Sequence, residues 1–433
     1  MGQGDVGQYI ALEHVESWTG RIRSTTTDMP YDSQLKRFRA NDVLFGKLRP
    51  YLAKVARPIN DGVCVGEFLV LRTNTEQITS HYLECLLRSK PIIDAINSST
   101  YGARMPRADW QFIGSLCIPI PSIQEQVAIS RFLDHADRKI RRYIRAKQKL
   151  IKLLEEQKQA IIHRAVTLGL DPDVPLKPSG IDWLGDIPAH WQVLRLKAIT
   201  SHVTSGSRGW SNYQADDGAL FIRIGNLRRG SIGLNLDEVI RLALPHDALS
   251  EARRTLVQAN DILLSITAYI GSVAVVPDGL GEAYVSQHVA CCRLRPMAAN
   301  PRWIGYVLVS EIGKTHGRLS MNGGTKQGLS LDDVRNHIVL VPPPAEQTRI
   351  VDYLDSALSA FDTVVRELDT NIRRIQEFRD RLISDVVTGK LDVREAAAKL
   401  TDEVGDDDAA DEVDLDDQSS EIEDMEVPED VAS

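Results

Sequence analysis

Apolar residues recur at alternating steps of three and four positions in two long stretches of this chain. One stretch follows Pro119-Ile120-Pro121 and the other follows Pro342-Pro343-Pro344. This spacing keeps one face of a helix apolar along its length, as in a coiled coil. We therefore predict two helices of about 45 residues, each ~65 Å long. The residues expected to pack the helix pair are Ile129, Leu133, Ile140, Leu150 and Leu154 in the first, and Ile350, Leu354, Leu358, Phe361, Leu368 and Ile375 in the second.

Both helices have recognisable start and stop residues. Ser122, with Glu125 three residues later, predicts a capping box at the start of the first helix, and Gly169 predicts its end. The second helix is expected to end at Thr388-Gly389-Lys390. Glu346 occupies the same place in the second helix as Glu125 in the first. We interpret both as acids that complement a helix start rather than as catalytic acids.

The other segments have short apolar runs interrupted by Gly, Asn and Asp. This pattern is typical of buried strands separated by turns. Strands are expected at residues 42–46, 68–72, 261–265 and 288–293. A short helix is expected at His81–Ser89 and again at Arg302–Ser310. Each long helix therefore follows a segment that mixes strands and helices.

Much of this pattern occurs twice, at a constant offset of 221 residues. Gln124-Glu125-Gln126 returns as Ala345-Glu346-Gln347, and Phe132-Leu133-Asp134 returns as Tyr353-Leu354-Asp355. Two copies of a long segment suggest two pseudo-equivalent halves rather than a solenoid. Such halves suit a bipartite partner, and DNA read at two half-sites is one such partner.

Neither long helix has enough neighbours in its own half to cover its apolar stripe. We expect the two helices to pack on each other within the chain, antiparallel, with one mixed domain at each end. The predicted fold class is α+β: two mixed α/β domains separated by two long antiparallel coiled-coil helices, with a pseudo-two-fold internal repeat. Pairing of the helices between two chains remains the alternative.

The composition is ordinary for a soluble protein, with 43% hydrophobic and 26% charged residues, and 433 residues allow two to four domains. No apolar run approaches ~18 residues, and the N-terminus lacks a signal-peptide pattern. We therefore expect a cytoplasmic protein without membrane contact. The five cysteines include no Cys-x-x-Cys pair, which favours free thiols in a reducing compartment.

The net charge of −9 is unevenly distributed. Residues 401–433 contain 16 Asp or Glu and no Lys or Arg, so the rest of the chain carries a net charge of +7. A basic body fits a nucleic-acid partner, although a charge of this size is also common by chance. The tail has the composition of a solvated, disordered extension.

The sequence lacks common signatures of catalysis. It contains no Gly-x-x-x-x-Gly-Lys-Ser/Thr loop for ATP, and no Asn-Pro-Pro-aromatic or Asp-Pro-Pro-aromatic motif for base methylation. The ten histidines are scattered, without a His-x-x-x-His pair that could hold a metal ion on a helix. We therefore expect a non-catalytic chain with no metal and no cofactor of its own.

Short motifs follow one another in the same order in both halves. They are Leu12–Gly20, Asp42–Lys54, Ile118–Asp134, Ala165–Leu170, Ser179–Trp191 and Val386–Asp392. In their order and doubling they resemble the specificity (S) subunit of a Type I restriction-modification system. The first two resemble the entry and interior of a target-recognition domain, and the next two resemble the start and end of the central conserved helix. The resemblance covers about residues 9–392.

The resemblance implies a subunit that recognises a bipartite double-stranded DNA target. Partner subunits would carry out adenine methylation or restriction. The partners implied are two modification methyltransferase subunits, docked on the long helices, and restriction endonuclease/translocase subunits. S-adenosylmethionine and ATP would belong to those partners.

Pattern and resemblance together predict five segments. They are residues 1–119 (target-recognition domain 1), 120–180 (first long helix and linker), 181–341 (target-recognition domain 2), 342–395 (second long helix) and 396–433 (acidic disordered tail). The first domain is expected to be shortened at its N-terminus. Tyr9 in the first half corresponds to Phe221 in the second. Only eight residues precede Tyr9, whereas about 30 residues separate the opening His190-Trp191 from Phe221.

The polar groups that could read DNA lie in the mixed segments. Arg and Lys can bind guanine edges or phosphate, and Asn and Gln can read adenine. The candidates are Lys47, Arg49, Tyr51, Lys54, Tyr101, Arg104 and Arg107 in the first half, and Arg208, Trp210, Asn212, Arg228, Arg229, Tyr269, Asn322, Thr325, Lys326 and Gln327 in the second. For any single residue, an ordinary surface position is the alternative.

Two other functions remain open from the sequence. One is a structural coiled-coil scaffold without sequence-specific DNA binding, for which the positive charge is incidental. The other is a standalone methyltransferase or nuclease, which the missing motifs argue against.

Overall fold

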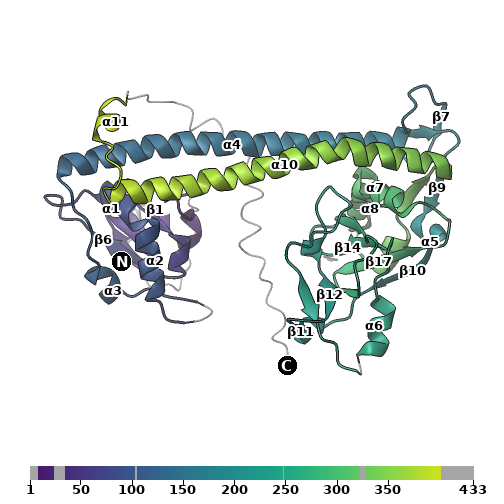
Figure 1. Ribbon diagram of the computed structural model, residues 1–433, viewed down its shortest axis with the longest axis horizontal. Coiled ribbons are helices and arrows are strands. Elements are labelled where there is room, and N and C mark those ends of the chain that lie inside the picture. Colours follow the sequence, from purple (N-terminus) through teal and green to yellow (C-terminus); the bar gives the residue numbers. More distant parts are fainter. Residues whose placement is uncertain (1–7, 24–34, 103–104, 247, 322–327, 401–433) are drawn as a thin grey trace, which may run out of the picture. The chain divides into compact units, whose positions relative to one another are not determined.

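Two long helices, α4 (Ile123–Leu168) and α10 (Pro344–Val387), dominate the computed structural model (Figure 1). The structure describes residues 8–23, 35–102, 105–246, 248–321 and 328–400. The chain forms two compact units. Unit 1 comprises residues 1–144 and 373–433, and unit 2 comprises residues 145–372. Each long helix therefore contributes one part to each unit.

The predicted start and end of the first helix are confirmed. The Glu125 N–H donates to Ser122 Oγ at 3.4 Å, and the Ser122 N–H donates to Glu125 Oε2 at 3.1 Å. This reciprocal pair satisfies N–H groups that have no partner inside the helix. At the other end, Gly169 has a φ of +73°, a left-handed conformation that glycine adopts without steric cost.

The described residues of unit 1 form two three-stranded sheets. In the sheet ordered β1-β5-β2, β1 is parallel to β5 and β2 is antiparallel; the sheet ordered β4-β3-β6 is antiparallel. The strands are β1 (Gln8–Ile10), β2 (Leu35–Phe38), β3 (Val43–Gly46), β4 (Val55–Ala56), β5 (Gly62–Val65) and β6 (Phe68–Leu71). The helices are η1 (Leu12–His14), η2 (Pro50–Leu52), α1 (Ser80–Leu87), α2 (Lys90–Ser98), α3 (Trp110–Ser115) and α11 (Arg394–Ala398). The strands and short helix predicted for this half are confirmed as β3, β6 and α1.

The core of unit 1 lies where α1 meets both long helices. Buried Tyr82, Cys85 and Leu86 on α1 pack with Ile129 and Leu133 of α4 and with Ile383, Val386 and Val387 of α10. The Tyr82 hydroxyl donates to the Val387 carbonyl at 3.2 Å, or to the Pro119 carbonyl at 3.1 Å. The tyrosine is therefore buried with its polar atom hydrogen-bonded, as a buried hydroxyl requires.

Within the part of unit 2 that the structure describes, there are two four-stranded sheets and two strand pairs. Their orders are β10-β17-β14-β15, β11-β13-β12-β16, β18-β9 and β7-β8, and β12 with β16 is the parallel pair. The strands are β7 (Leu176–Pro178), β8 (Asp186–Pro188), β9 (Gln192–Arg195), β10 (Thr200–Ser205), β11 (Gln214–Ala215), β12 (Ala219–Ile222), β13 (Ile240–Leu242), β14 (Ile262–Ser265), β15 (Val273–Val275), β16 (Ala283–Val285), β17 (Val289–Leu294) and β18 (Ile338–Val341). The helices are α5 (Leu196–Ile199), η3 (Trp210–Tyr213), η4 (Ile224–Asn226), α6 (Leu249–Thr255), α7 (Pro301–Val309), α8 (Glu311–Met321) and α9 (Leu331–Arg335). The predicted strands are confirmed as β14 and β17, and the short helix as α7.

In unit 2, α7 and α8 lie between the β14–β17 sheet and the long helices (Figure 1). The largest buried side chains of this layer are Trp191 and Trp303, whose rings meet edge to face at 5.5 Å. They pack with Ile162 of α4 and with Ile350 of α10. The apolar stripes are thus buried where a third element covers them.

Burial of the stripes is less continuous than predicted. Leu150 is 44% exposed, contrary to its predicted packing role, and Phe378 is 58% exposed. Leu154, Phe361 and Ile375 are half-buried. On a straight helix a seven-residue repeat drifts by ~20° per heptad, so one partner helix does not cover every stripe position. The remaining predicted packing residues are buried.

The same hydrogen bonds form around two glutamines that lie 221 positions apart. Gln126 Oε1 accepts from the Thr79 N–H at 2.7 Å, and its Nε2 donates to the Pro121 carbonyl at 2.9 Å. Gln347 Oε1 accepts from the Asn300 N–H at 2.8 Å, and its Nε2 donates to the Pro342 carbonyl at 2.8 Å. Both glutamines are buried, and each ties the start of a long helix to the start of a short one, α1 or α7.

Candidate nucleic-acid interface

In unit 1 the candidate DNA-reading residues gather around the hairpin loop between β3 and β4. Arg49 has a φ of +48°, a conformation that non-glycine residues rarely adopt, and its N–H donates to the Pro106 carbonyl at 2.8 Å. The Ala108 N–H donates to the Lys47 carbonyl at 2.9 Å. These bonds join the hairpin loop to the segment that carries Tyr101 and Arg107.

The side chains of this cluster differ in their exposure and in their partners within the fold. Tyr101 and Tyr51 are 65% and 42% exposed. Arg107 forms an exposed ion pair with Glu67 at 2.9 Å. Lys54 donates instead to the Leu12 carbonyl at 3.1 Å, which gives it a bond within the fold. Arg104 lies outside the described residues.

In unit 2 the corresponding hairpin loop joins β14 to β15 and carries Tyr269. The guanidinium carbon of Arg229 lies 3.6 Å from the centroid of the Tyr269 ring, a cation–π contact. Tyr269 has a φ of +54°, and its carbonyl accepts from Ser265 Oγ at 2.6 Å. Arg228, beside Arg229, is exposed and lies 3.7 Å from Asp237. The structure thus brings Arg229 and Tyr269 together, and the side chain of Arg228 lies toward Asn235 and Asp237.

Trp210 was expected among the DNA-reading residues, and the structure does not support this. Its side chain is 3% exposed and packs with Phe221, Leu242 and Ala252; its ring meets that of Tyr284 edge to face at 5.5 Å. Trp210 is a core residue because burial of its large apolar ring is favourable. Its neighbours Arg208 and Asn212 are exposed. Asn322, Thr325, Lys326 and Gln327 lie outside the described residues.

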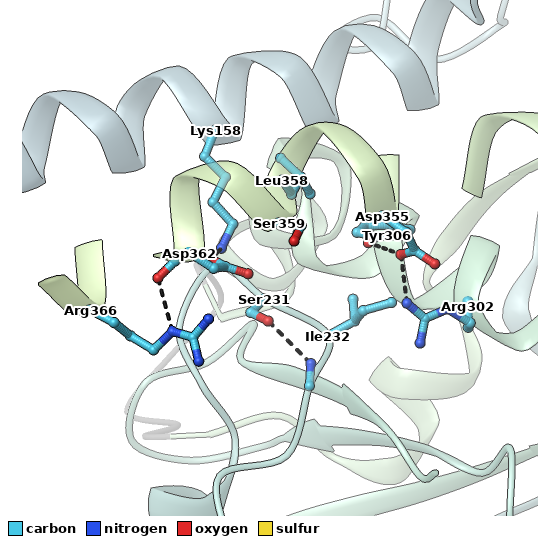
Figure 2. Close-up of a pocket in the computed structure, with 11 residues that line it drawn as sticks. Lys158, Ser231, Ile232, Arg302, Tyr306, Asp355, Leu358, Ser359, Asp362 and Arg366 are labelled. Carbon is cyan, nitrogen blue, oxygen red and sulfur yellow. Dashed lines mark hydrogen bonds and ion pairs between the residues drawn. The ribbon is translucent and has the colours of Figure 1, made fainter. Parts of the chain in front are cut away.

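A polar pocket of about 360 Å³ lies between the helices and the loop of Ser231 in unit 2 (Figure 2). Asp355 on α10 accepts from Arg302 and from the Tyr306 hydroxyl, each at 2.6 Å. Burial and the hydrogen bond to Asp355 raise the pKa of Tyr306, so its hydroxyl stays protonated. Across the pocket, Lys158 of α4 pairs with Asp362 of α10.

Unit 1 has a related pair at positions 221 residues earlier. His81 Nε2 lies 3.0 Å from Asp134 Oδ1, where unit 2 has Arg302 and Asp355. Burial opposes the charged form of His81, but hydrogen bonds to Asp134 and Cys85 raise its pKa to about 10. Both units therefore place a cation of the short helix against a carboxylate of a long helix. The sequence analysis did not predict these two pairs, although a comparison of the two halves at the offset of 221 residues would have found them.

Two kinds of site are not found in the described part of the chain. No three His, Cys, Asp or Glu side chains cluster there in a way that could hold a metal ion. Among the helices of the described ranges, none combines the length and apolarity needed to cross a membrane. All five cysteines are free, and Cys117 is exposed.

Comparisons with known proteins assign this architecture to a family. The chain matches the Type I restriction modification DNA specificity domain over residues 8–153 and 214–372. These two matches cover more than half of the chain. The protein therefore belongs to the type I restriction-modification specificity family, and its role is that of the DNA-recognition subunit.

Individual relatives are distant but span much of the chain. The type I restriction enzyme MjaVIII specificity subunit of Methanocaldococcus jannaschii is 23% identical over 69% of this chain and 68% of its own length. The EcoBI specificity subunit of Escherichia coli is 23% identical over 69% of this chain and 63% of its own length. A solved structure concerning complex assembly and conformational transition of the type I R-M system contains a chain with a TM-score of 0.61 and 21% identity, covering 88% of this chain and 91% of that chain. That likeness shows the fold.

Proposed function

We propose that the two units recognise the two halves of a bipartite double-stranded DNA target. Unit 1 would read one half-site and unit 2 the other. The target-recognition domain of unit 1 would comprise residues 1–119, and that of unit 2 would comprise residues 181–341. The long-helix segments 120–180 and 342–395 would form an antiparallel coiled-coil pair that relates the domains by a pseudo-two-fold repeat. Residues 396–433 would be an acidic tail.

One observation carries this proposal: in each unit, candidate DNA-reading residues lie on or beside the corresponding hairpin loop. The β3–β4 loop carries Arg49 and Tyr51, and the β14–β15 loop carries Tyr269 beside Arg229. Loops held by a rigid sheet are suited to binding because their ends are fixed. Arginine supplies both phosphate contacts and guanine readout, and tyrosine supplies hydrogen bonds to phosphate.

The relatives support a role within a larger assembly. They are named as specificity subunits of type I restriction enzymes, and the solved neighbour concerns assembly of the type I R-M system. We infer that this chain works with two modification methyltransferase subunits and with restriction endonuclease/translocase subunits. Catalysis, S-adenosylmethionine and ATP would then belong to those partners, and the complex would act in the cytoplasm.

The test is a footprint of the chain with its cognate methyltransferase subunit on DNA. We expect two protected tracts separated by an unprotected spacer. Arg49→Ala should weaken protection of one tract, and Arg228→Ala should weaken protection of the other. A single continuous tract, or none, would contradict the proposal. Weak binding without sequence preference would instead favour a structural coiled-coil scaffold.

A further inference from the structure

The middle of α4 is strongly basic, and the equivalent part of α10 is not. Residues 138–152 of α4 contain eight Lys or Arg and no Asp or Glu. The α10 residues at the offset of 221, 359–373, contain two Arg and three Asp or Glu. A function that both long helices perform, such as docking of one partner on each repeat, would need similar charges on both. Such a shared function therefore does not explain the basic segment of α4.

In unit 1 this segment carries cations that have no partner among the described residues. Arg138, Lys139 and Arg142 are exposed, and no side chain of the described ranges forms an ion pair with them. Arg141 differs, because it pairs with Asp137 at 2.7 Å. Three cations within five positions repel one another unless an anion lies beside them. They therefore form a candidate site for a polyanionic segment.

The last described residue of the chain lies on the same face of α4. The Arg131 guanidinium donates to the Leu400 carbonyl at 2.6 Å. Arg138 follows Arg131 by seven residues, close to two turns, so the two positions lie within ~20° of each other around the helix. Arg142 follows Arg131 by eleven residues, close to three turns, and lies within ~20° of it as well. Leu400 is thus held at one end of a row of three arginines.

The sequence that follows Leu400 is acidic. Residues 401–433 lie outside the described ranges; they contain 16 Asp or Glu and no Lys or Arg, and ten of the acids fall within 402–417. Arg142 is ~17 Å along the helix from Arg131, a distance that about six extended residues span. The first acids after Leu400 can therefore reach every cation of the row.

We propose that residues 402–417 of the chain bind Arg138, Lys139 and Arg142 of α4, and that they thereby keep other polyanions, DNA phosphates included, from this face of the helix. A single exposed ion pair contributes little. Several pairs act together here, because attachment at Leu400 gives the acidic segment an effective concentration of about 1 mM or more. Binding of DNA would then depend on the reading loops and not on the charge of the helix.

The position of the acidic segment is tested by treating the full chain with a carbodiimide, which joins a carboxylate to a lysine amine in contact with it. Lys139 is the lysine of the site, and Lys90 of α2, whose side chain is 60% exposed, is the control. Residues 402–417 should cross-link to Lys139 at least ~10-fold more often than to Lys90. Salt at ~1 M should abolish the difference. Equal cross-linking of the two lysines at low salt would overturn the proposal.

Two further arms of this experiment identify the site and the chain that fills it. Arg138→Ser with Arg142→Thr introduces the residues that α10 has at the offset of 221, and should reduce cross-linking although Lys139 remains. Unchanged cross-linking would place the acidic segment elsewhere. In a mixture of isotopically heavy and light chains, cross-links should join heavy to heavy and light to light. Heavy–light products would mean that a second copy fills the site, and the proposal would be wrong.

The exclusion of DNA is tested with a duplex that lacks the target sequence, at low salt. Replacement of the ten acids of 402–417 by Asn and Gln should strengthen binding by the full chain ~10-fold. In a chain that also carries Arg138→Ser, Lys139→Ala and Arg142→Thr, the same replacement should change binding less than ~2-fold, because no site remains to be uncovered. An equal gain in both chains would mean that the acids repel DNA through net charge alone, and a gain in neither would contradict the exclusion.

Discussion

The carboxylate of Asp42 receives two hydrogen bonds from the guanidinium of Arg72, at 2.8 and 2.6 Å. The pair joins the residue before β3 to the residue after β6. In unit 2, Asp261 and Arg293 make the same two bonds at 2.8 and 2.7 Å, between the start of β14 and β17. Each aspartate also accepts a backbone N–H three residues before it, from Arg39 or Gln258. Each unit therefore fastens the same strand pair with one buried carboxylate.

Replacement of Asp261 should be costly. Its side chain is 1% exposed, and Asp261→Ala would remove both carboxylate hydrogen bonds of the Arg293 guanidinium, which would keep its bond to the Leu256 carbonyl. We expect the free energy of unfolding to fall by about 3 kcal/mol, measured by urea denaturation. The control is Asp237→Ala, which removes an exposed partner of Arg228 and should cost at most ~1 kcal/mol. Equal effects of the two substitutions would show that the buried pair contributes little.

The His81–Asp134 pair should make unit 1 sensitive to high pH. The folded-state pKa of His81 is raised to about 10, whereas an unfolded histidine has a pKa of ~6.5. The stabilisation is therefore fully present below pH ~6.5 and is lost as pH rises through about 10. His81→Gln should destabilise the chain by about 1 kcal/mol at pH 6.5, and by less at pH 10.5.

His81→Arg is the matched control for that titration, because unit 2 has Arg302 at the same position. Arginine keeps its charge over this pH range. The difference in unfolding free energy between His81→Arg and His81→Gln should therefore stay constant with pH. If the difference in unfolding free energy between the wild type and His81→Gln is also constant with pH, the raised pKa of His81 is contradicted.

The two units should contribute to different half-sites. Arg49→Ala and Arg228→Ala should each cost about 1–3 kcal/mol at one half-site if the arginine reads a base. If the arginine contacts only phosphate, affinity should fall on all sequences and the salt slope should decrease by about one. Competition binding with DNA altered in one half-site separates these outcomes. A loss at the same half-site for both variants would contradict the assignment of one half-site to each unit.

The proposed helix pair should set the length of the DNA spacer. Four residues inserted in α4, with four at the facing position of α10, should add ~6 Å to the pair. This corresponds to roughly two base pairs of spacer at ~3.4 Å each. Mapping of modified adenines in DNA with different spacers measures the shift.

An insertion of two residues is the comparison, because it turns the apolar stripe by about 200° and should disrupt folding. The half-site sequences should stay unchanged in the four-residue variant, since its reading loops are intact. A folded four-residue variant with an unchanged spacer preference would mean that the helices serve for docking and do not measure distance.

The elements that sequence analysis predicted well are those with a local cause. The long helices have a periodic stripe and, for α4, a capping box at Ser122 and Glu125, so their existence and ends could be predicted. The strands β3 and β14 are apolar runs that begin after an aspartate. In contrast, burial of Leu150 depends on whether a third element covers the stripe, and no local pattern contains that information.

The candidate site was harder to predict because side-chain direction is decided by tertiary packing. Trp210 lies in a Gly-rich, polar stretch, yet its ring turns into the core beside Tyr284. Lys54 donates a hydrogen bond to the backbone carbonyl of Leu12. The pairs His81–Asp134 and Arg302–Asp355 join residues 53 positions apart, so only comparison of the two halves could suggest them.

The hydrogen bond from Tyr82 to the Val387 carbonyl spans 305 residues of sequence. During synthesis, residues 145–372 can complete their unit as soon as they leave the ribosome, whereas the first residues to be made must wait for the last long helix. The part of the α1 face that Ile383, Val386 and Val387 cover therefore stays exposed until the end of α10 is translated. The unit that is begun first is therefore completed last, and this part of its core has the longest exposure to aggregation and to chaperones.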